Sequence, residues 1–189
     1  MDANDEASIS IVRERMVYSN QYGSLYDDDV QFEPAGNRGR YVRWCWRPSY
    51  SVAAIALPKQ DTSLLVWNFR HSARRVILEA VKGFGDEARS PADVARAELR
   101  EELGFITDSL VYLGTTFADA AFAYQPMYCY LASGYLGCQP EQESSEAING
   151  YEEFDLRRVP EALSSGELSD SVTLLMLWQA FYRWEGRNG

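Results

Sequence analysis

The spacing of hydrophobic and polar residues in the first fifty positions predicts β-strands. Runs of β-branched and aromatic residues lie at 9–12, 30–32 and 41–46. Groups of turn-forming residues separate them, at 22–24, 27–29 and 34–39. The N-terminal third is therefore expected to form an antiparallel β-subdomain that has no helix of its own.

After this region the pattern predicts a sheet with more deeply buried strands. Ser51–Leu57 is a continuous apolar run, which is typical of a strand covered on both faces. Residues 64–70 have the composition of its hairpin partner. Further strands are predicted at 76–81, 110–117, 127–136 and 150–156.

Two helices complete the predicted elements. The first has a capping Ser90, a proline at Pro91 and a stop at Gly104. Its apolar stripe consists of Ala92, Ala95, Leu99 and Leu103. The second is an amphipathic helix over 169–184, preceded by a short helical turn at 160–165. Strands surrounding two helices predict an α+β sandwich.

Composition narrows the classes of function. Lys and Arg number 18 against 28 Asp and Glu, a net charge of −10, which disfavours nucleic-acid and anionic-membrane partners. The three cysteines (Cys45, Cys129 and Cys138) are odd in number and include no C-x-x-C pair. They predict no disulfide framework and suit a reducing compartment. With no apolar run of membrane length and an acidic start, we expect a cytoplasmic globule.

The first helix carries the clearest candidate chemistry. Glu98, Glu101 and Glu102 are spaced i, i+3 and i+4, so their carboxylates share one helix face. Like charges this close repel unless a cation lies among them, and Mg²⁺ prefers oxygen ligands. The alternative is a solvated acidic face paired with Arg96 and Arg100.

The segment from Gly83 to Phe105 resembles the Nudix box, Gly-x5-Glu-x7-Arg-Glu-U-x-Glu-Glu-x-Gly-U, where U is a bulky apolar residue. The matching positions are Gly83, Glu98, Leu99, Glu101, Glu102, Gly104 and Phe105. The chain is thereby identified as a member of the Nudix hydrolase superfamily. This resemblance implies an α/β/α sandwich with a mixed sheet. It also implies Mg²⁺, or alternatively Mn²⁺, held by the three glutamates and the backbone carbonyl of Lys82.

Two positions depart from the box. Arg89 stands at its first glutamate and Ala97 at its arginine, two residues that help to fix the loop against the helix in the family. Losing both removes a matched pair without leaving one charge unpaired. Glu87, Arg89 and Arg96 are candidates for a substitute pair.

Three other segments resemble ADP-ribose pyrophosphatases. Asn68–Arg70 corresponds to Gln-Tyr-Arg, Leu78–Gly83 to Leu-Glu-x-Pro-Ala-Gly, and 166–173 to Gly-x-Ile-x-Asp-x-x-Thr. These enzymes carry an N-terminal sheet that helps to build a dimer. The resemblance therefore implies a dimerisation region over 1–48, a hydrolase domain over 49–189, and a homodimer.

The resemblance also suggests roles for individual side chains. Glu146 best matches the loop glutamate that acts as general base, with Glu143 as second choice and Glu101 counted with the catalytic group. The alternative for both loop residues is a plain solvated loop. Arg70 is expected to bind a phosphate or to form a surface ion pair.

The remaining candidates are buried or aromatic. Glu79, in an apolar strand, is interpreted as a substrate-binding residue or as the partner of Arg74 or Arg75. Trp44 and Trp46 share a strand face, which suits stacking on an adenine ring or packing in a core or dimer interface.

The favoured function is Mg²⁺-dependent hydrolysis of the diphosphate bond of ADP-ribose, or of a related nucleoside diphosphate sugar. The products would be a nucleoside monophosphate and a sugar phosphate. A second hypothesis, motivated by Arg89 and Ala97, is a non-catalytic Nudix domain that binds a nucleotide metabolite as a sensor or partner module. A third, hydrolysis of oxidised nucleoside triphosphates, is disfavoured by the N-terminal extension and by residues 170–174.

Overall fold

The computed structural model of the chain describes residues 7–141 and 147–188. They form two compact units. The first contains the residues up to Ser49 together with Phe117–Gln125, and the second contains Tyr50–Thr116 and the residues from Pro126 onward. The predicted division into 1–48 and 49–189 had not assigned 117–125 to the first unit. No helix in the described part of the chain combines the length and the apolar character needed to cross a membrane.

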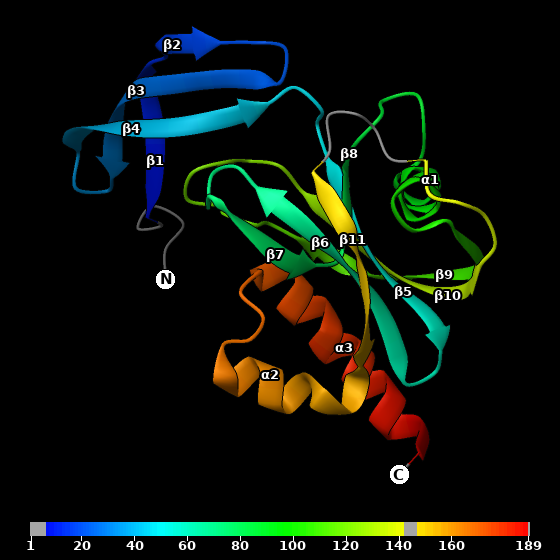
Figure 1. The fold of residues 1–189 in the computed structure, drawn as a ribbon. Helices are drawn as coiled ribbons and strands as arrows, with labels where there is room; N and C mark the ends of the chain where they lie inside the picture. Colours follow the sequence, from blue (N-terminus) through cyan, green and yellow to red (C-terminus); the bar gives the residue numbers. More distant parts are fainter. Residues whose placement is uncertain (1–6, 142–146, 189) are drawn as a thin grey trace. The chain divides into compact units, whose positions relative to one another are not determined.

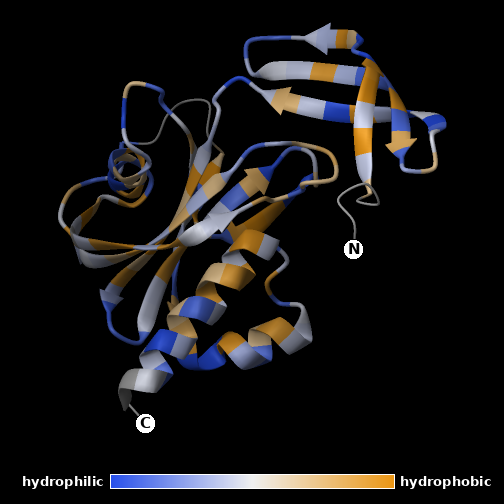
Figure 2. Cartoon of the chain, turned by 180° about the vertical axis from the view of Figure 1, so that it is seen from behind, coloured by the Kyte–Doolittle hydropathy of each residue, from blue (hydrophilic) through white to orange (hydrophobic). Residues whose placement is uncertain are grey.

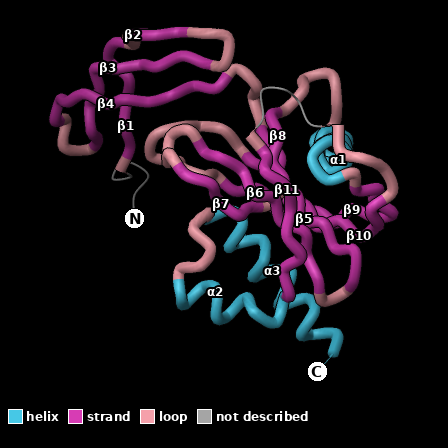
Figure 3. Tube along the Cα trace, in the orientation of Figure 1, coloured by secondary structure: helices cyan, strands magenta, loops and turns pink. Residues whose placement is uncertain are grey.

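The described residues of the first unit form a four-stranded antiparallel sheet and no helix (Figures 1 and 3). Its strands are β1 (Ser8–Arg13), β2 (Met16–Ser19), β3 (Gly23–Glu33) and β4 (Asn37–Trp46). The long β3 pairs with each of the other three strands. The turn predicted at 27–29 is therefore wrong, because these residues lie in the middle of β3.

Charge pairing explains why β3 continues through three consecutive aspartates. Asp28 is buried, and it accepts a hydrogen bond of 2.6 Å from Arg43 Nε and one of 3.1 Å from the backbone N–H of Arg15. Asp27 forms ion pairs with Arg15 and Arg40. Burial opposes the charge of Arg43, but its hydrogen bonds to Asp28 and Glu14 raise its pKa above the ordinary value. Cross-strand ion pairs thus offset the low strand propensity of aspartate.

The second unit contains a mixed seven-stranded sheet. The main strand order is β11 (Ile148–Asp155), β6 (Thr62–Arg70), β5 (Ser51–Lys59), β10 (Met127–Leu136) and β9 (Phe105–Thr116). Two short strands complete it, β7 (Arg75–Glu79) beside β6 and β8 (Val81–Phe84) beside β5. Only the β5–β10 pair is parallel among the described pairs.

Helices cover both faces of this sheet (Figure 1). Helix α1 (Pro91–Leu103) lies on one side, and α2 (Val159–Ser165) and α3 (Ser171–Asn188) lie on the other, after the short 3-10 helix η1 (Leu156–Arg158). Figure 2 shows hydrophobic residues recurring along α3. The predicted α+β class, with an α/β/α sandwich around a mixed sheet and an N-terminal antiparallel sheet, is confirmed.

Strand β5 shows why the sheet needs both helical layers. Val52 and Ala54 belong to the hydrophobic cluster that includes α1, whereas Ala53 and Ile55 belong to the cluster that includes α3. All four side chains are at most 1% exposed. Because successive strand residues point to opposite faces, the apolar run predicted to be covered on both faces is covered in this way.

Helix α1 has the predicted ends. Ser90 Oγ accepts a hydrogen bond of 3.2 Å from the N–H of Asp93, and Pro91 occupies the first turn. Gly104 ends the helix with φ 67°, and its N–H donates to the carbonyl of Arg100 at 2.8 Å. A left-handed residue at this position is a common helix end, and glycine adopts it without strain.

Several strand boundaries differ from prediction, among them the starts of β3, β4 and β11, and β2 was not predicted. Two further differences lie next to helices. The strand expected over 76–81 is split at Ala80 into β7 and β8, because the Ala80 N–H donates to Thr173 Oγ1 at 2.9 Å. Strand β9 begins at Phe105, five residues before the predicted start, directly after the end of α1.

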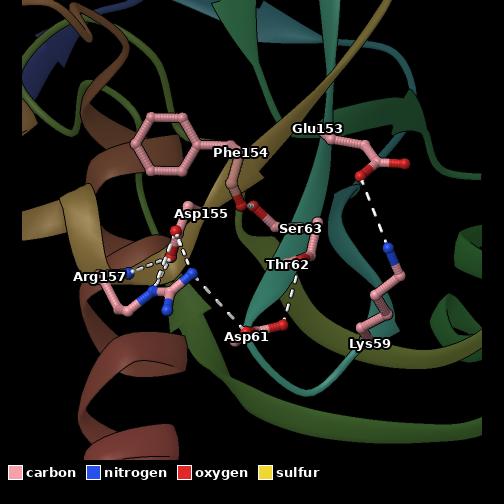
Figure 4. Close-up of polar contacts among 8 residues, drawn as sticks. All are labelled: Lys59, Asp61, Thr62, Ser63, Glu153, Phe154, Asp155 and Arg157. Atoms are coloured by element: carbon pink, nitrogen blue, oxygen red, sulfur yellow. Dashed lines mark hydrogen bonds and ion pairs between the residues drawn. The ribbon is translucent and has the colours of Figure 1, made fainter.

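The start of β6 and the end of β11 are joined by polar contacts (Figure 4). Asp155 caps η1, accepting hydrogen bonds from the backbone N–H of Arg157 at 2.9 Å and from its guanidinium at 2.6–2.9 Å. The same guanidinium lies 3.9 Å from Asp61. Ser63 Oγ donates to the carbonyl of Phe154 at 3.2 Å. The hydrogen bonds from Arg157 hold the pKa of Asp155 below its ordinary value.

We expect Arg157→Gln to raise the pKa of Asp155 toward its ordinary value of 3.8. This pKa is lowered on folding, so the ionised carboxylate stabilises the fold at any pH above its ordinary pKa. That stabilisation is lost as the pH falls through the lower, folded-state pKa. Carbon NMR of the carboxyl group against pH measures the shift. Arg158→Gln is the control and should raise the pKa less, because Arg158 bonds Glu167 instead. Equal shifts in both variants would contradict the assignment.

Candidate active site

The candidate site forms where α1 packs on β8. A Cβ atom added to Gly83 would overlap the carboxylate of Glu98, so that side chain lies directly against the β8 backbone. Any residue larger than glycine at position 83 would displace the carboxylate. The glycine that opens the motif and the first glutamate of its helix are therefore coupled through space.

The other two glutamates of α1 differ in their surroundings. Glu102 is one turn beyond Glu98 and therefore on the same side of the helix, and it is only 3% exposed. Glu101 is half-buried, and its carbonyl accepts a hydrogen bond of 2.9 Å from the N–H of Glu141. Within residues 7–141 and 147–188, no three acidic, histidine or cysteine side chains are gathered as a metal-binding group.

The donors nevertheless fit a hard divalent cation. Glu98 and Glu102 provide carboxylates on one side of α1, one packed on backbone and the other nearly excluded from solvent. Carboxylate and carbonyl oxygens are the ligands that Mg²⁺ and Mn²⁺ prefer. Lys82, whose carbonyl is the predicted backbone ligand, immediately precedes Gly83 in β8.

A buried ionic network lies beside this pair of elements. The side chain of Glu79 is 2% exposed, and its two oxygens lie 2.5 Å from Arg70 Nη2 and 3.1 Å from Lys82 Nζ. Lys82 Nζ also lies 2.7 Å from Asp170 Oδ1. The observed partners of Glu79 are thus Arg70 and Lys82.

The two arginines expected as alternative partners of Glu79 lie elsewhere. Arg74 bonds His71 at 2.8 Å and lies over the ring of Phe69, and Arg75 is an exposed residue at the start of β7. The interpretation of Glu79 as their partner is wrong. The turn between β6 and β7 places Arg74 and Arg75 away from the buried Glu79 carboxylate. Binding of a phosphate by Arg70 and of substrate by Glu79 stays a prediction.

Asp170 connects this network to the first turn of α3. It accepts hydrogen bonds from the N–H of Thr173 at 2.8 Å and from Thr173 Oγ1 at 2.6 Å. Burial opposes its ionisation, but the charge and hydrogen bond of Lys82 and the bonds from Thr173 outweigh it and lower the pKa of Asp170. Sequence reasoning gave no role to the Lys82 ammonium, Asp170 or Thr173. The Asp-x-x-Thr spacing at 170–173 was the signal for the latter two.

The loop between β8 and α1 is fixed by a tyrosine in place of the missing charged pair. Tyr50 Oη lies 2.8 Å from the carbonyl of Asp86 and 3.0 Å from that of Arg89, and it accepts from the N–H of Asp86 at 3.2 Å. The Tyr50 carbonyl accepts from the N–H of Gly85 at 2.9 Å. Arg89 donates to the carbonyl of Asp93 at 2.8 Å.

Arg96, a candidate for the substitute pair, forms its ion pair with Asp93 at 3.3 Å, within the helix itself. The described contacts of this loop thus include the Tyr50 hydrogen bonds and the bond from the Arg89 guanidinium to Asp93, where the family motif has Glu and Arg at the positions of Arg89 and Ala97.

The remaining predicted residues lie in other parts of the chain. Trp44 and Trp46 contact each other edge to face, with ring centroids 5.5 Å apart, on β4 of the first unit. The backbone N–H of Trp44 donates to the carbonyl of Phe122 at 2.8 Å, within the same unit. Their stacking on a base stays a prediction. Glu143 and Glu146 lie outside the described residues.

Comparisons with known proteins give the following similarities. The family model for the NUDIX domain matches residues 47–172. ADP-ribose pyrophosphatase of Bacillus subtilis (strain 168) is 24% identical over 135 residues, 71% of each chain. Methanol dehydrogenase activator of Bacillus methanolicus is 25% identical over 123 residues, 65% of each chain. The crystal structure of an ADP compounds hydrolase superposes with a TM-score of 0.77 over 96% of both chains. At 20% identity, that likeness shows the fold alone.

We expect Tyr50→Phe to lower the free energy of unfolding by about 0.5–1.5 kcal/mol, because it removes part-buried hydrogen bonds to the loop backbone. Hydrogen exchange should also speed up at the N–H groups of Gly85 and Asp86. Tyr128→Phe is the matched control, since its ring contacts that of Tyr50 edge to face at a centroid distance of 5.7 Å. Urea unfolding measures both variants, and equal losses would mean that the Tyr50 hydroxyl does not fix the loop.

Proposed function

The chain belongs to the NUDIX family, and on that premise we propose that it hydrolyses the diphosphate bond of ADP-ribose or a related nucleoside diphosphate sugar. The packing of Glu98 on Gly83 is the observation that carries this proposal, because it preserves the spatial core of the motif despite Arg89 and Ala97. The name of the similar Bacillus subtilis protein supports the substrate class.

The proposed metal is Mg²⁺, with Mn²⁺ as an alternative. Glu98, Glu102 and Glu101 would hold it together with the Lys82 carbonyl. When bound, such an ion neutralises diphosphate charge and makes a water molecule more acidic. The residues of the chain must then orient the diphosphate and accept a proton from the attacking water.

Arg70 is the proposed diphosphate ligand, because its planar guanidinium can donate two parallel hydrogen bonds to phosphate oxygens. A water oxygen attacks one phosphorus, and the bridging P–O bond breaks. One phosphate leaves with the nucleoside and the other with the sugar. Glu146, or Glu143, is the proposed acceptor of the water proton.

The sensor hypothesis predicts binding of nucleotide sugars without turnover. The hydrogen bonds of Tyr50 to the loop favour the enzyme, since they hold this loop where the motif's charged pair is missing. Metal-dependent release of products across a panel of nucleoside diphosphate sugars separates the two functions. Binding with no hydrolysis of any member would establish the sensor.

We also propose a homodimer built through the first unit, in which the strands of residues 9–46 help to wall the partner's site. Every residue of β1 and β2 is exposed, although several are large and apolar. These apolar residues are Ile9, Ile11, Val12, Met16, Val17 and Tyr18, each 49–59% exposed. Large apolar side chains exposed in this number are typical of a protein–protein interface.

We expect Glu102→Gln to lower kcat/KM by about 100-fold or more, since loss of a ligand charge removes several kcal/mol of metal-dependent stabilisation. The fold should be retained, because the cap and apolar stripe of α1 are unchanged. Steady-state kinetics at saturating Mg²⁺, with thermal unfolding, provides the measurement. Glu161→Gln, an exposed change on α2, is the control. Wild-type activity in Glu102→Gln would remove that residue from the site.

Light scattering of the full-length chain should give about twice the monomer mass of 21.5 kDa at micromolar concentration. Ile11→Lys should shift it toward the monomer, because it places a charge on an apolar strand face. Ser10→Lys is the control, since neighbouring strand residues point to opposite faces. A fully active wild-type protein with the monomer mass would contradict the dimer.

A further inference from the structure

Glu79 lies between two cations whose environments differ. The side chain of Lys82 is 13% exposed and that of Arg70 is 39% exposed, against 2% for Glu79. Lys82 also contacts Asp170, so its ammonium bridges two carboxylates. Arg70, by contrast, has Glu79 as its only ion-pair partner among the residues that the structure describes.

The two cations also differ in how the backbone holds them. Lys82 is inside β8, where it is in register with Ala53 in the buried first part of β5. Arg70 is the last residue of β6, immediately before the turn that leads to β7. Its guanidinium is therefore the one that can move away with little rearrangement of the sheet.

Arg70 can move away from Glu79 only if the buried Glu79 carboxylate is not left without a cation. Removing one partner of a buried ion pair is strongly destabilising when the remaining charge has no other partner. Here Lys82 lies 3.1 Å from the Glu79 oxygen that Arg70 does not contact, so the carboxylate would keep a cation after Arg70 moves. Thr173 donates two hydrogen bonds to Asp170, which stabilise the second carboxylate that Lys82 bridges.

We propose that Lys82 is a positioning residue: it is the fixed counter-ion of Glu79 and allows Arg70 to exchange Glu79 for an oxygen of the anionic substrate. This inference rests on the proposed hydrolysis of a diphosphate. Lys82 acts on substrate through Arg70 without touching the diphosphate.

Lys82→Met tests the proposal, since it removes the charge and keeps a long side chain. Glu79 then has only Arg70, which should remain bound to it. We expect KM for ADP-ribose to rise about tenfold, with kcat changed less than about threefold. Lys59→Met is the matched control, because Lys59 is 67% exposed and lies 3.9 Å from Glu153. A fall in kcat and in the unfolding temperature with unchanged KM would mean that Lys82 is only structural.

A second comparison removes both buried charges. Glu79→Gln combined with Lys82→Met leaves Arg70 without a carboxylate to hold it, and KM should return to within about threefold of the wild-type value. If KM of the double variant is as high as that of Lys82→Met, Glu79 does not retain Arg70 and the proposal is overturned.

A binding measurement separates this proposal from the proposed function. Inorganic pyrophosphate, with Mg²⁺ present, is titrated into each folded variant by calorimetry, and its Kd should follow the same order as KM. If the wild type hydrolyses no nucleoside diphosphate sugar but the Kd order holds, the proposed function fails and the exchange at Arg70 stands. If the Kd values of wild type and Lys82→Met are equal, the exchange is refuted whatever the activity.

Discussion

The position of strand β8 against α1 is the constraint on which the rest of the site depends. Gly83 admits the Glu98 carboxylate against its backbone, while Lys82, one residue earlier, reaches a buried carboxylate on β7 and another at the start of α3. Two neighbouring residues thereby link β8 to both helical layers. A shift of β8 by one residue would exchange their faces, so the register is strongly specified.

The central strand β5 allows this constraint to be met. Its side chains fill one hydrophobic cluster with α1 and the other with α3, so the two helices are held on opposite faces of the same rigid strand. Strand β8 pairs directly with the first half of β5. The hydrophobic effect therefore holds α1 and α3 on the two faces of the sheet. Polar contacts then determine the position of the loop between β8 and α1.

Local signals made much of the fold predictable from the sequence. Ser90 and Gly104 specify the ends of α1 through cap geometry, and the apolar run of β5 specifies burial on both faces. The failures arose where distant residues decide. Asp27–Asp29 resemble a turn until the arginines of other strands are placed beside them, and Ala80 breaks a strand because of Thr173, which is 93 residues away. The partners of Glu79 were missed for the same reason.

The loop after β8 shows how a motif tolerates the loss of a charged pair. An ion pair there must overcome the desolvation of both partners, and losing only one of them leaves a costly unpaired charge. The Tyr50 hydroxyl instead satisfies backbone groups of Asp86 and Arg89 without placing any charge in the loop. The Arg89 guanidinium donates a hydrogen bond to the carbonyl of Asp93 in α1. Since the loop is anchored by Tyr50, the residue immediately before β5, the start of the strand that separates the two cores also positions the residues that precede α1.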